Sequence, residues 1–195
     1  MTPIPPPGGF PPLSEAALQE RLMDILRSGP EKWRKVPITK SNSDARTLFD
    51  LIGDRKYGQD FDLKEEECLP RGNSVLSEDL FCLEKPDIVL WSKHSGQHRI
   101  VFELKQRAKP THKEPNASQF LRYFLHLLVT SDLKPKRKQD VRRGVLMVAP
   151  AQWFEHKSSA DAWNYLVEHY GPLSEQFDIT LGEIRAEHLS EDRLR

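Results

Sequence analysis

Two carboxylates and a lysine occur at a spacing that suits chemistry on a phosphate group. Asp87 precedes the apolar run 88–91, and Glu103 and Lys105 close a second apolar run, 99–104. A hard divalent cation such as Mg²⁺ favours carboxylate oxygens, keeps several waters and leaves room for phosphate oxygens. A lysine beside that site can orient or deprotonate an attacking water and offset charge on the phosphate. The pattern therefore indicates metal-dependent phosphodiester hydrolysis.

The two apolar runs are predicted to be β-strands joined by a turn at Gly96, because they are short, rich in β-branched and aromatic residues, and separated by polar residues. Side chains alternate between the faces of a strand, so Glu103 and Lys105 share one face. Directly paired residues of an antiparallel hairpin also share a face. We therefore expect Asp87 opposite Glu103 or Lys105, and not opposite Leu104, with the side of Leu104 forming the core.

A helix is predicted over residues 116–130, after the second strand. Gln119, Arg122, Tyr123 and His126 lie at helical spacing on a polar side, and leucines and phenylalanines fill the apolar side. On the polar side we expect Gln119 and Tyr123 to contact phosphate and base. The structural alternatives are a helix-capping role for Gln119 and an ordinary surface position for Tyr123. We expect His126 to be a bystander.

These three elements together resemble the PD-(D/E)xK nuclease superfamily, in its RecB-type branch. The matching residues are Pro86-Asp87, Glu103-Leu104-Lys105 and the Gln119–Tyr123 segment, which fits Q-x-x-x-Y. The resemblance covers roughly residues 75–150. It implies an α/β fold with a restriction-endonuclease-like core, in which a mixed β-sheet is flanked by α-helices.

The resemblance also implies a metal site for Mg²⁺, with Mn²⁺ as a substitute. Asp87 and Glu103 are then the ligands, and the Leu104 carbonyl is a further one. In the superfamily an acidic residue on the helix before the sheet can complete the site. Glu20 is the candidate for that residue, and a solvated surface glutamate is the alternative reading.

The function implied is that of a Mg²⁺-dependent deoxyribonuclease in DNA repair, restriction or defence. Lys105 would position or activate the water, and Gln119 and Tyr123 would steady the scissile strand. The alternative is a catalytically inactive nuclease-fold module that binds nucleic acid or protein. Strand preference, DNA versus RNA, and exo- versus endo-cleavage stay open.

Charge is unevenly distributed along a chain whose net charge is zero. Residues 105–143 hold eleven Lys and Arg against three acids, an excess of eight that the rest of the chain balances. Such segregation indicates a surface that faces a polyanion, here DNA. The candidate nucleic-acid-binding residues are Arg122, Lys134, Lys136, Arg137, Lys138, Arg142 and Arg143.

Other elements follow from periodicity and from turn residues. Residues 1–12, with six prolines, are predicted to be a disordered tail, and residues 13–195 a single domain. The stretch 54–85 is acidic and is expected to be largely a solvated loop or helix face. Helices are expected at 14–28, 43–52 and 159–170, and strands within 75–83 and at 144–149 and 177–184.

Several classes of site are not expected. Cys68 and Cys82 form no C-x-x-C pair, so we expect no iron–sulfur cluster or zinc site. The chain has no Walker-type phosphate loop, so we expect no ATP site, and a helicase or defence partner would be a separate chain. No signal peptide or membrane-spanning run is apparent, so a cytoplasmic location without membrane contact is expected. A homodimer is a further possibility for a nuclease of this kind.

Overall fold

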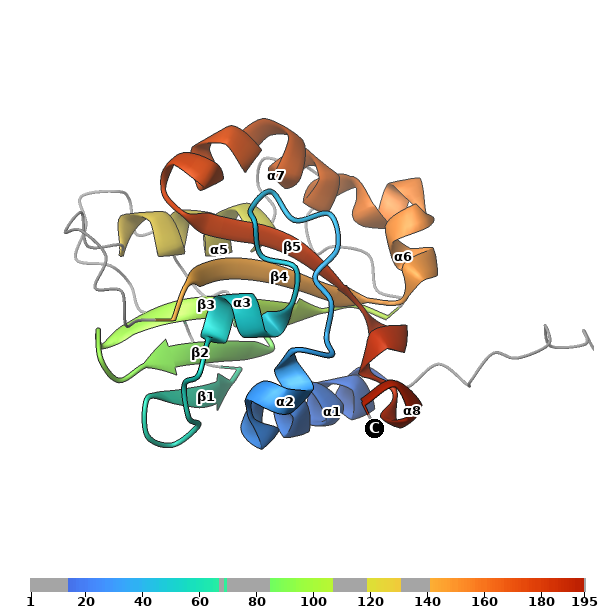
Figure 1. The fold of residues 1–195 in the computed structure, drawn as a ribbon. Helices are drawn as coiled ribbons and strands as arrows, with labels where there is room; N and C mark the ends of the chain where they lie inside the picture. Colours follow the sequence, from blue (N-terminus) through green and yellow to red (C-terminus); the bar gives the residue numbers. More distant parts are fainter. Residues whose placement is uncertain (1–13, 67–68, 70–84, 107–118, 131–140, 195) are drawn as a thin grey trace, which may run out of the picture.

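Five strands form one mixed sheet in the computed structural model, which describes residues 14–66, 69, 85–106, 119–130 and 141–194 (Figure 1). The sheet order is the order of the strands in the chain. Their bounds are β1 (Phe61–Glu65), β2 (Ile88–Ser92), β3 (Gln97–Leu104), β4 (Arg143–Ala149) and β5 (Ile179–Arg185). The strands β1, β2 and β3 run antiparallel to one another, whereas β3, β4 and β5 are parallel.

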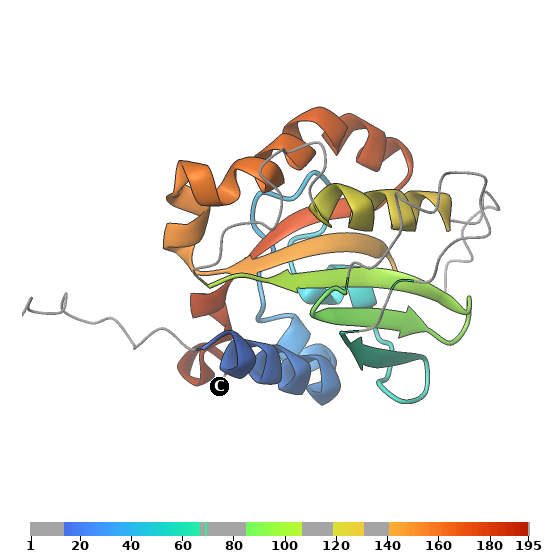
Figure 2. The same ribbon diagram turned by 180° about the vertical axis from the view of Figure 1, so that it is seen from behind.

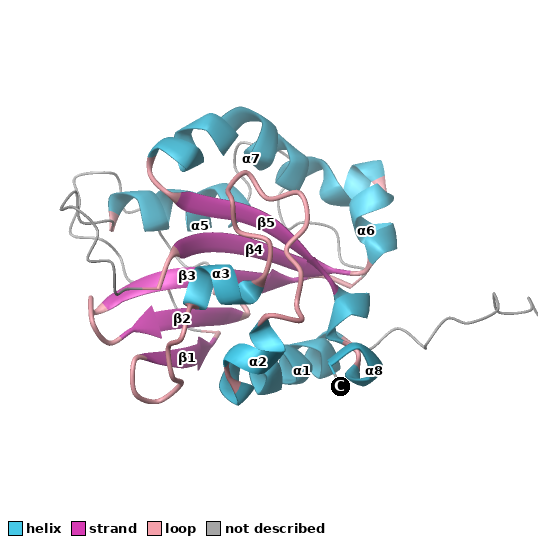
Figure 3. Cartoon of the chain, in the orientation of Figure 1, coloured by secondary structure: helices cyan, strands magenta, loops and turns pink. Residues whose placement is uncertain are grey.

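Helices cover both faces of this sheet, as the colouring by secondary structure makes plain (Figure 3). The helices are α1 (Glu15–Ser28), α2 (Pro30–Trp33), α3 (Leu48–Ile52), α5 (Gln119–Val129), α6 (Ala151–Glu155), α7 (Lys157–Gln176), the 3₁₀ helix η2 (Ala186–Leu189) and α8 (Glu191–Leu194). The predicted α/β class, with a mixed sheet flanked by helices, is therefore confirmed. None of the described helices is long and apolar enough to cross a bilayer.

Each face of the sheet carries its own hydrophobic core. One core packs α1, α2 and α3 against the face that bears Ile100, Phe102 and Leu104. The other packs α5, α6 and α7 against the face that bears Val101 and Val145, as the reverse view shows (Figure 2). The prediction of one core side for the hairpin was thus too narrow, because central strands of a helix-covered sheet are buried on both faces.

The hairpin has the predicted pairing and one irregularity. Val89 pairs with Val101 and Ile88 with Phe102, so the register extended by one residue puts Asp87 opposite Glu103. At the other end the register shifts by one, so that Leu90 pairs with Ile100 but Trp91 pairs with His98. Such a bulge turns His98 onto the face that Val101 occupies.

The strand beside β2 is not where the sequence indicated. It is β1, residues 61–65, within the stretch that was expected to be a solvated loop or helix face. Phe61 is fully buried and Leu63 packs on the core, so the apolar–polar alternation of residues 61–64 was a strand signal that the acidic composition of the stretch outweighed. The strand predicted within 75–83, the tail 1–12, and both cysteines lie outside the described residues.

Two predicted helices have different bounds in the structure. The helix expected at 43–52 begins only at Leu48, because Thr47 and Asp50 form a capping box there. The helix expected to stop at Gly171-Pro172 continues to Gln176 with Pro172 inside it. The carbonyl that Pro172 leaves unbonded is that of Glu168, an exposed residue whose backbone water can reach. The elements predicted at 14–28, 144–149 and 177–184 are confirmed as α1, β4 and β5.

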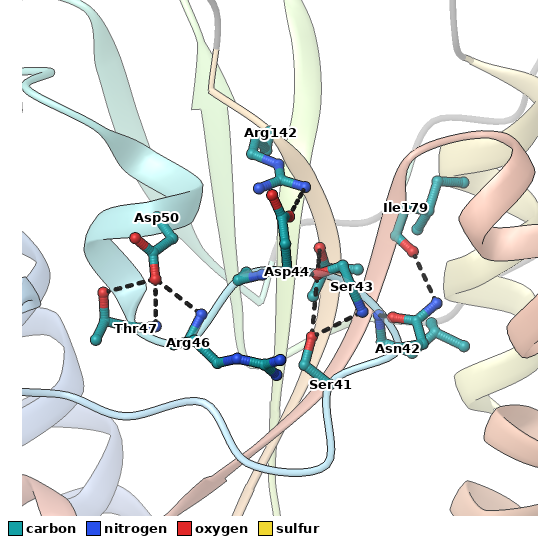
Figure 4. A network of polar contacts seen from close by, with 12 residues as sticks. Ser41, Asn42, Ser43, Asp44, Arg46, Thr47, Asp50, Arg142 and Ile179 are labelled. Atoms are coloured by element: carbon teal, nitrogen blue, oxygen red, sulfur yellow. Dashed lines mark hydrogen bonds and ion pairs between the residues drawn. The ribbon is translucent and has the colours of Figure 1, made fainter.

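The outer edge of β5 is covered by the segment before α3. Thr39 forms an isolated antiparallel bridge with Glu183, and the Asn42 side chain accepts a hydrogen bond from the Leu181 amide at 2.6 Å. The Asn42 amide also donates to the carbonyl of Ile179 at 3.4 Å (Figure 4). These contacts satisfy backbone groups that an open edge strand would expose.

Candidate active site

The Glu103 carboxylate lies at the centre of a buried polar cluster between β3 and α5. Glu103 is 4% exposed, and its Oε1 accepts hydrogen bonds from Lys105 Nζ at 2.5 Å and from Gln119 Nε2. Its Oε2 accepts from the Tyr123 hydroxyl at 3.0 Å. Charge-assisted hydrogen bonds of this kind are stronger than neutral ones. The second and third elements of the sequence pattern therefore converge on one carboxylate.

The helix α5 contributes to this cluster from the side that carries Gln119, Tyr123 and His126. Gln119 and Tyr123 are one helical turn apart, and both are buried against the sheet, at 4% and 1% exposure. His126 follows on the same side and is buried as well. The alternative reading of Tyr123 as an ordinary surface residue is therefore wrong, and His126, expected to be a bystander, is buried beside it. Their polar atoms are buried because they have partners on β3.

Asp87 approaches the cluster from the residue just before β2. Its Oδ2 accepts a hydrogen bond from the backbone amide of Leu104 at 2.6 Å. The backbone amide of Lys105 donates to the carbonyl of Val148 in β4. Successive residues of a strand direct their backbone groups to opposite sides, so those of Leu104 point away from β4, toward Asp87. Extending the register by two puts Pro86 opposite Leu104, and proline has no N–H to offer. The Leu104 carbonyl thus receives no ladder donor from that position.

The pKa values of both carboxyl groups are raised. Burial raises the pKa of Glu103 to about 7, with the charge of Asp87 adding to the effect and Lys105 opposing it. Burial also raises the pKa of Asp87, against the lowering effects of the Leu104 amide and of Lys105. Two close carboxyl groups with raised pKa values favour a positively charged ligand between them.

Lys105 is held as an ammonium. Burial alone would lower its pKa, but the charge and the hydrogen bond of Glu103, with Asp87 and Glu15, outweigh burial and raise the pKa. A lysine in this state donates hydrogen bonds and offsets negative charge. It does not accept a proton at neutral pH.

The acidic residue on α1 that acts on this cluster is Glu15. Its charge raises the pKa values of both Asp87 and Lys105, and it lies in the first turn of the helix. The predicted candidate, Glu20, is exposed further along α1 and lines a small cavity with Gln19 and other residues. Nothing in the sequence distinguishes one glutamate of this helix from another as the acid near the site.

The predicted nucleic-acid-binding residues that the structure describes are not gathered at this cluster. Arg142 pairs with Asp44 at 2.6 Å (Figure 4), and Arg143 donates to the carbonyls of Leu127 and Phe177. Arg143 lies four residues before the β4 residue that pairs with Glu103, which is about 13 Å along the strand. Arg122 is half-buried on α5. The remaining four, Lys134, Lys136, Arg137 and Lys138, lie outside the described residues.

A buried histidine pair at the other end of β3 was not predicted. His98 Nδ1 and His126 Nε2 are 3.0 Å apart, and the ring of Trp91 packs edge-on against His98. Burial, and the neighbouring His98, lower the pKa of His126 to about 4. The β-bulge that turns His98 inward leaves no clear mark in the sequence, so strict alternation misplaces this side chain.

The donor set around Asp87 and Glu103 fits a hard cation with an incomplete protein shell. Within the described ranges, no group of three or more His, Cys, Asp or Glu side chains is arranged to hold a metal ion. Two carboxylates and the Leu104 carbonyl are oxygen ligands of the kind that Mg²⁺ takes together with waters and phosphate oxygens.

Comparisons with protein-family models, with curated proteins and with solved structures gave no match.

Proposed function

We propose that this protein is a metal-dependent deoxyribonuclease that hydrolyses phosphodiester bonds. The observation that carries the proposal is the convergence of Asp87, Glu103 and Lys105 from two paired strands, with Gln119 and Tyr123 holding Glu103. This arrangement agrees with the PD-(D/E)xK resemblance of the sequence and with a restriction-endonuclease-like core. DNA is the proposed substrate, acted on by a homodimer or beside a separate partner chain.

The carboxylates of Asp87 and Glu103 would hold Mg²⁺ or Mn²⁺, with the Leu104 carbonyl as a third protein ligand and Glu15 in place of Glu20 as the nearby acid. A cation bound there would supply Lewis-acid stabilisation of the charge that develops on the phosphate. Because the pKa of Glu103 is about 7, binding a cation at neutral pH releases part of a proton.

The chain's own residues orient the reaction. The Lys105 ammonium donates to the attacking water or to a phosphate oxygen, and so compensates negative charge at phosphorus during in-line attack. Gln119 and Tyr123 are positioning residues, since they fix the orientation of the Glu103 carboxylate. Since Lys105 is already protonated, the proton of the water passes to another acceptor, such as a phosphate oxygen or solvent.

The test is cleavage of linear, circular and single-stranded DNA by the purified protein, with and without Mg²⁺ or Mn²⁺. We expect metal-dependent products from the native chain and none from Asp87→Ala or Lys105→Ala. Lys32→Ala, at an exposed lysine of α2, is the matched control and should cleave normally. Equal cleavage by all four folded proteins would falsify the assignment.

One observation favours a second candidate, an inactive nuclease-fold module that binds nucleic acid or protein. Glu103 is nearly inaccessible and already accepts three hydrogen bonds, which a purely structural ion pair would also explain. That candidate predicts no turnover in either metal, with DNA binding that survives Glu103→Gln. The nuclease predicts turnover that this substitution abolishes.

A further inference from the structure

A small cavity lies next to the backbone of Asp87, beside the candidate active site. It has a volume of about 250 Å³ and opens between α1 and the end of β1. Its lining residues are Ala16, Gln19, Glu20, Met23, Arg27 and Glu65. The first five lie on one side of α1 at helical spacing, and the last is the final residue of β1.

One side chain joins this cavity to the active site. Gln19 Nε2 lies 3.2 Å from Glu65 Oε2 and 3.4 Å from the backbone carbonyl of Asp87. Gln19 therefore separates the cavity, which it lines, from the Asp87 backbone, which it contacts. The cavity thus borders Asp87 on the side of its backbone carbonyl, which also accepts from the Glu66 amide, whereas the Asp87 carboxylate accepts from the Leu104 amide of β3.

The charges of the lining exclude a phosphate as the occupant. Glu20 and Glu65 outnumber Arg27, and Arg27 already lies 3.8 Å from Glu65. The lining offers carboxylate acceptors, a guanidinium donor and a carboxamide that can do both. It therefore suits a neutral group whose edge carries both amino donors and ring acceptors.

The apolar part of the cavity lies beside an aromatic ring. Ala16 is exposed at the cavity, and Met23, only 2% exposed, lies at its base. Beside the cavity the Arg27 guanidinium lies over the ring of Tyr57 at 5.9 Å, and Tyr57 is 39% exposed. Exposed aromatic and guanidinium planes are the surfaces on which unpaired bases stack.

We propose that this cavity binds an amino-bearing nucleobase, cytosine or adenine, of a nucleotide next to the scissile phosphate. Glu20 accepts a hydrogen bond from the exocyclic amine, and Arg27 donates to a ring acceptor. A base in a duplex is stacked and paired, so only an unpaired base enters. The inference rests on the proposed nuclease activity and adds its substrate class, single-stranded or frayed DNA.

The binding test is independent of catalysis. Deoxycytidine and thymidine are titrated into the protein without metal, and the methyl signals of Ala16 and Met23 are followed by NMR. We expect deoxycytidine to shift both methyl signals at concentrations where thymidine does not, because thymidine lacks the exocyclic amine. Equal shifts, or no shift with either nucleoside, overturn the inference.

The cleavage test uses single-stranded oligothymidylate that carries one deoxycytidine at successive positions, with Mg²⁺. We expect cleavage about fivefold to tenfold faster with deoxycytidine at one fixed distance from the cut, the value of one amine contact. Glu20→Ala, which removes the acceptor, should abolish this preference while still cleaving oligothymidylate. Asp24→Ala, the same change at an exposed acid of α1 outside the cavity, should keep it.

Failure of the cavity and failure of the nuclease give different results. Cleavage without base preference, or a preference that Glu20→Ala keeps, overturns the proposed base site and leaves the proposed nuclease activity unaffected. NMR shifts with deoxycytidine in a protein that cleaves no DNA support the proposed base site and refute the proposed nuclease activity.

Discussion

Replacing Tyr123 with phenylalanine removes one donor from the Glu103 cluster and leaves the ring in place. The Tyr123 hydroxyl donates to Glu103 Oε2 at 3.0 Å, with both residues almost fully buried. A hydrogen bond to a charged group contributes about 1.5–3 kcal/mol, and solvent cannot replace it at this burial. For a chain of this size that corresponds to a fall in Tm of roughly 3–12 °C.

The loss should depend on pH, because the Glu103 carboxyl titrates with a pKa of about 7. At pH 8 the carboxylate is charged and the full effect of Tyr123→Phe is expected. At pH 5 it is protonated, so the loss should fall to about 1 kcal/mol, the value of a neutral hydrogen bond.

The assay is urea unfolding followed by circular dichroism at pH 5 and pH 8, without added metal. Tyr57→Phe is the control, because Tyr57 is 39% exposed and its ring contacts do not need the hydroxyl. A loss for Tyr123→Phe that equals the control, or one that is larger at pH 5, would refute a buried charged Glu103 held by this hydroxyl.

Three further outcomes are expected. Without metal, the raised pKa of Glu103 means that its contribution to stability is present below about pH 4.5 and is lost as the pH rises through 7. In urea unfolding, the stability of the native chain relative to Glu103→Gln should therefore fall as the pH rises through this window. The lowered pKa of His126 acts in the opposite sense, since stability is lost as the pH falls from about 6.5 to 4. His126→Gln should remove this part of the pH dependence of the free energy of unfolding, measured by urea unfolding across that window. Gly182→Ala should lower the free energy of unfolding by about 1–3 kcal/mol in chemical denaturation, because its Cβ would lie 2.5 Å from Ile38 Cγ2. The control Gly171→Ala should lower it less, because a Cβ there meets nothing within 4 Å.

The hairpin could be predicted because its signals are local. Apolar alternation predicted both strands, and the period of two limited the partner of Asp87 to Glu103 or Lys105, of which the register selects Glu103. The order of elements then indicated a helix-flanked α/β sheet, which the structure bears out.

The features that sequence reasoning missed depend on tertiary contacts. Gln119 and Tyr123 were predicted as site residues that contact phosphate and base, but their contact with Glu103 depends on how α5 packs on β3. The bulge in β3 is a pairing event between two strands, so no window of the sequence reports that His98 turns inward. In α7, Pro172 interrupts the helical pattern, but packing on both sides of it sustains the helix.

The central claim is that Asp87 and Glu103 together bind a divalent cation. Calorimetric titration of Mn²⁺ into the protein near pH 7, in two buffers of different ionisation enthalpy, measures binding and proton release together. We predict one site in the native chain with partial release of a proton, and loss of that site in Asp87→Asn. Binding of the same strength in Asp87→Asn, or no binding to the native chain, would contradict the account.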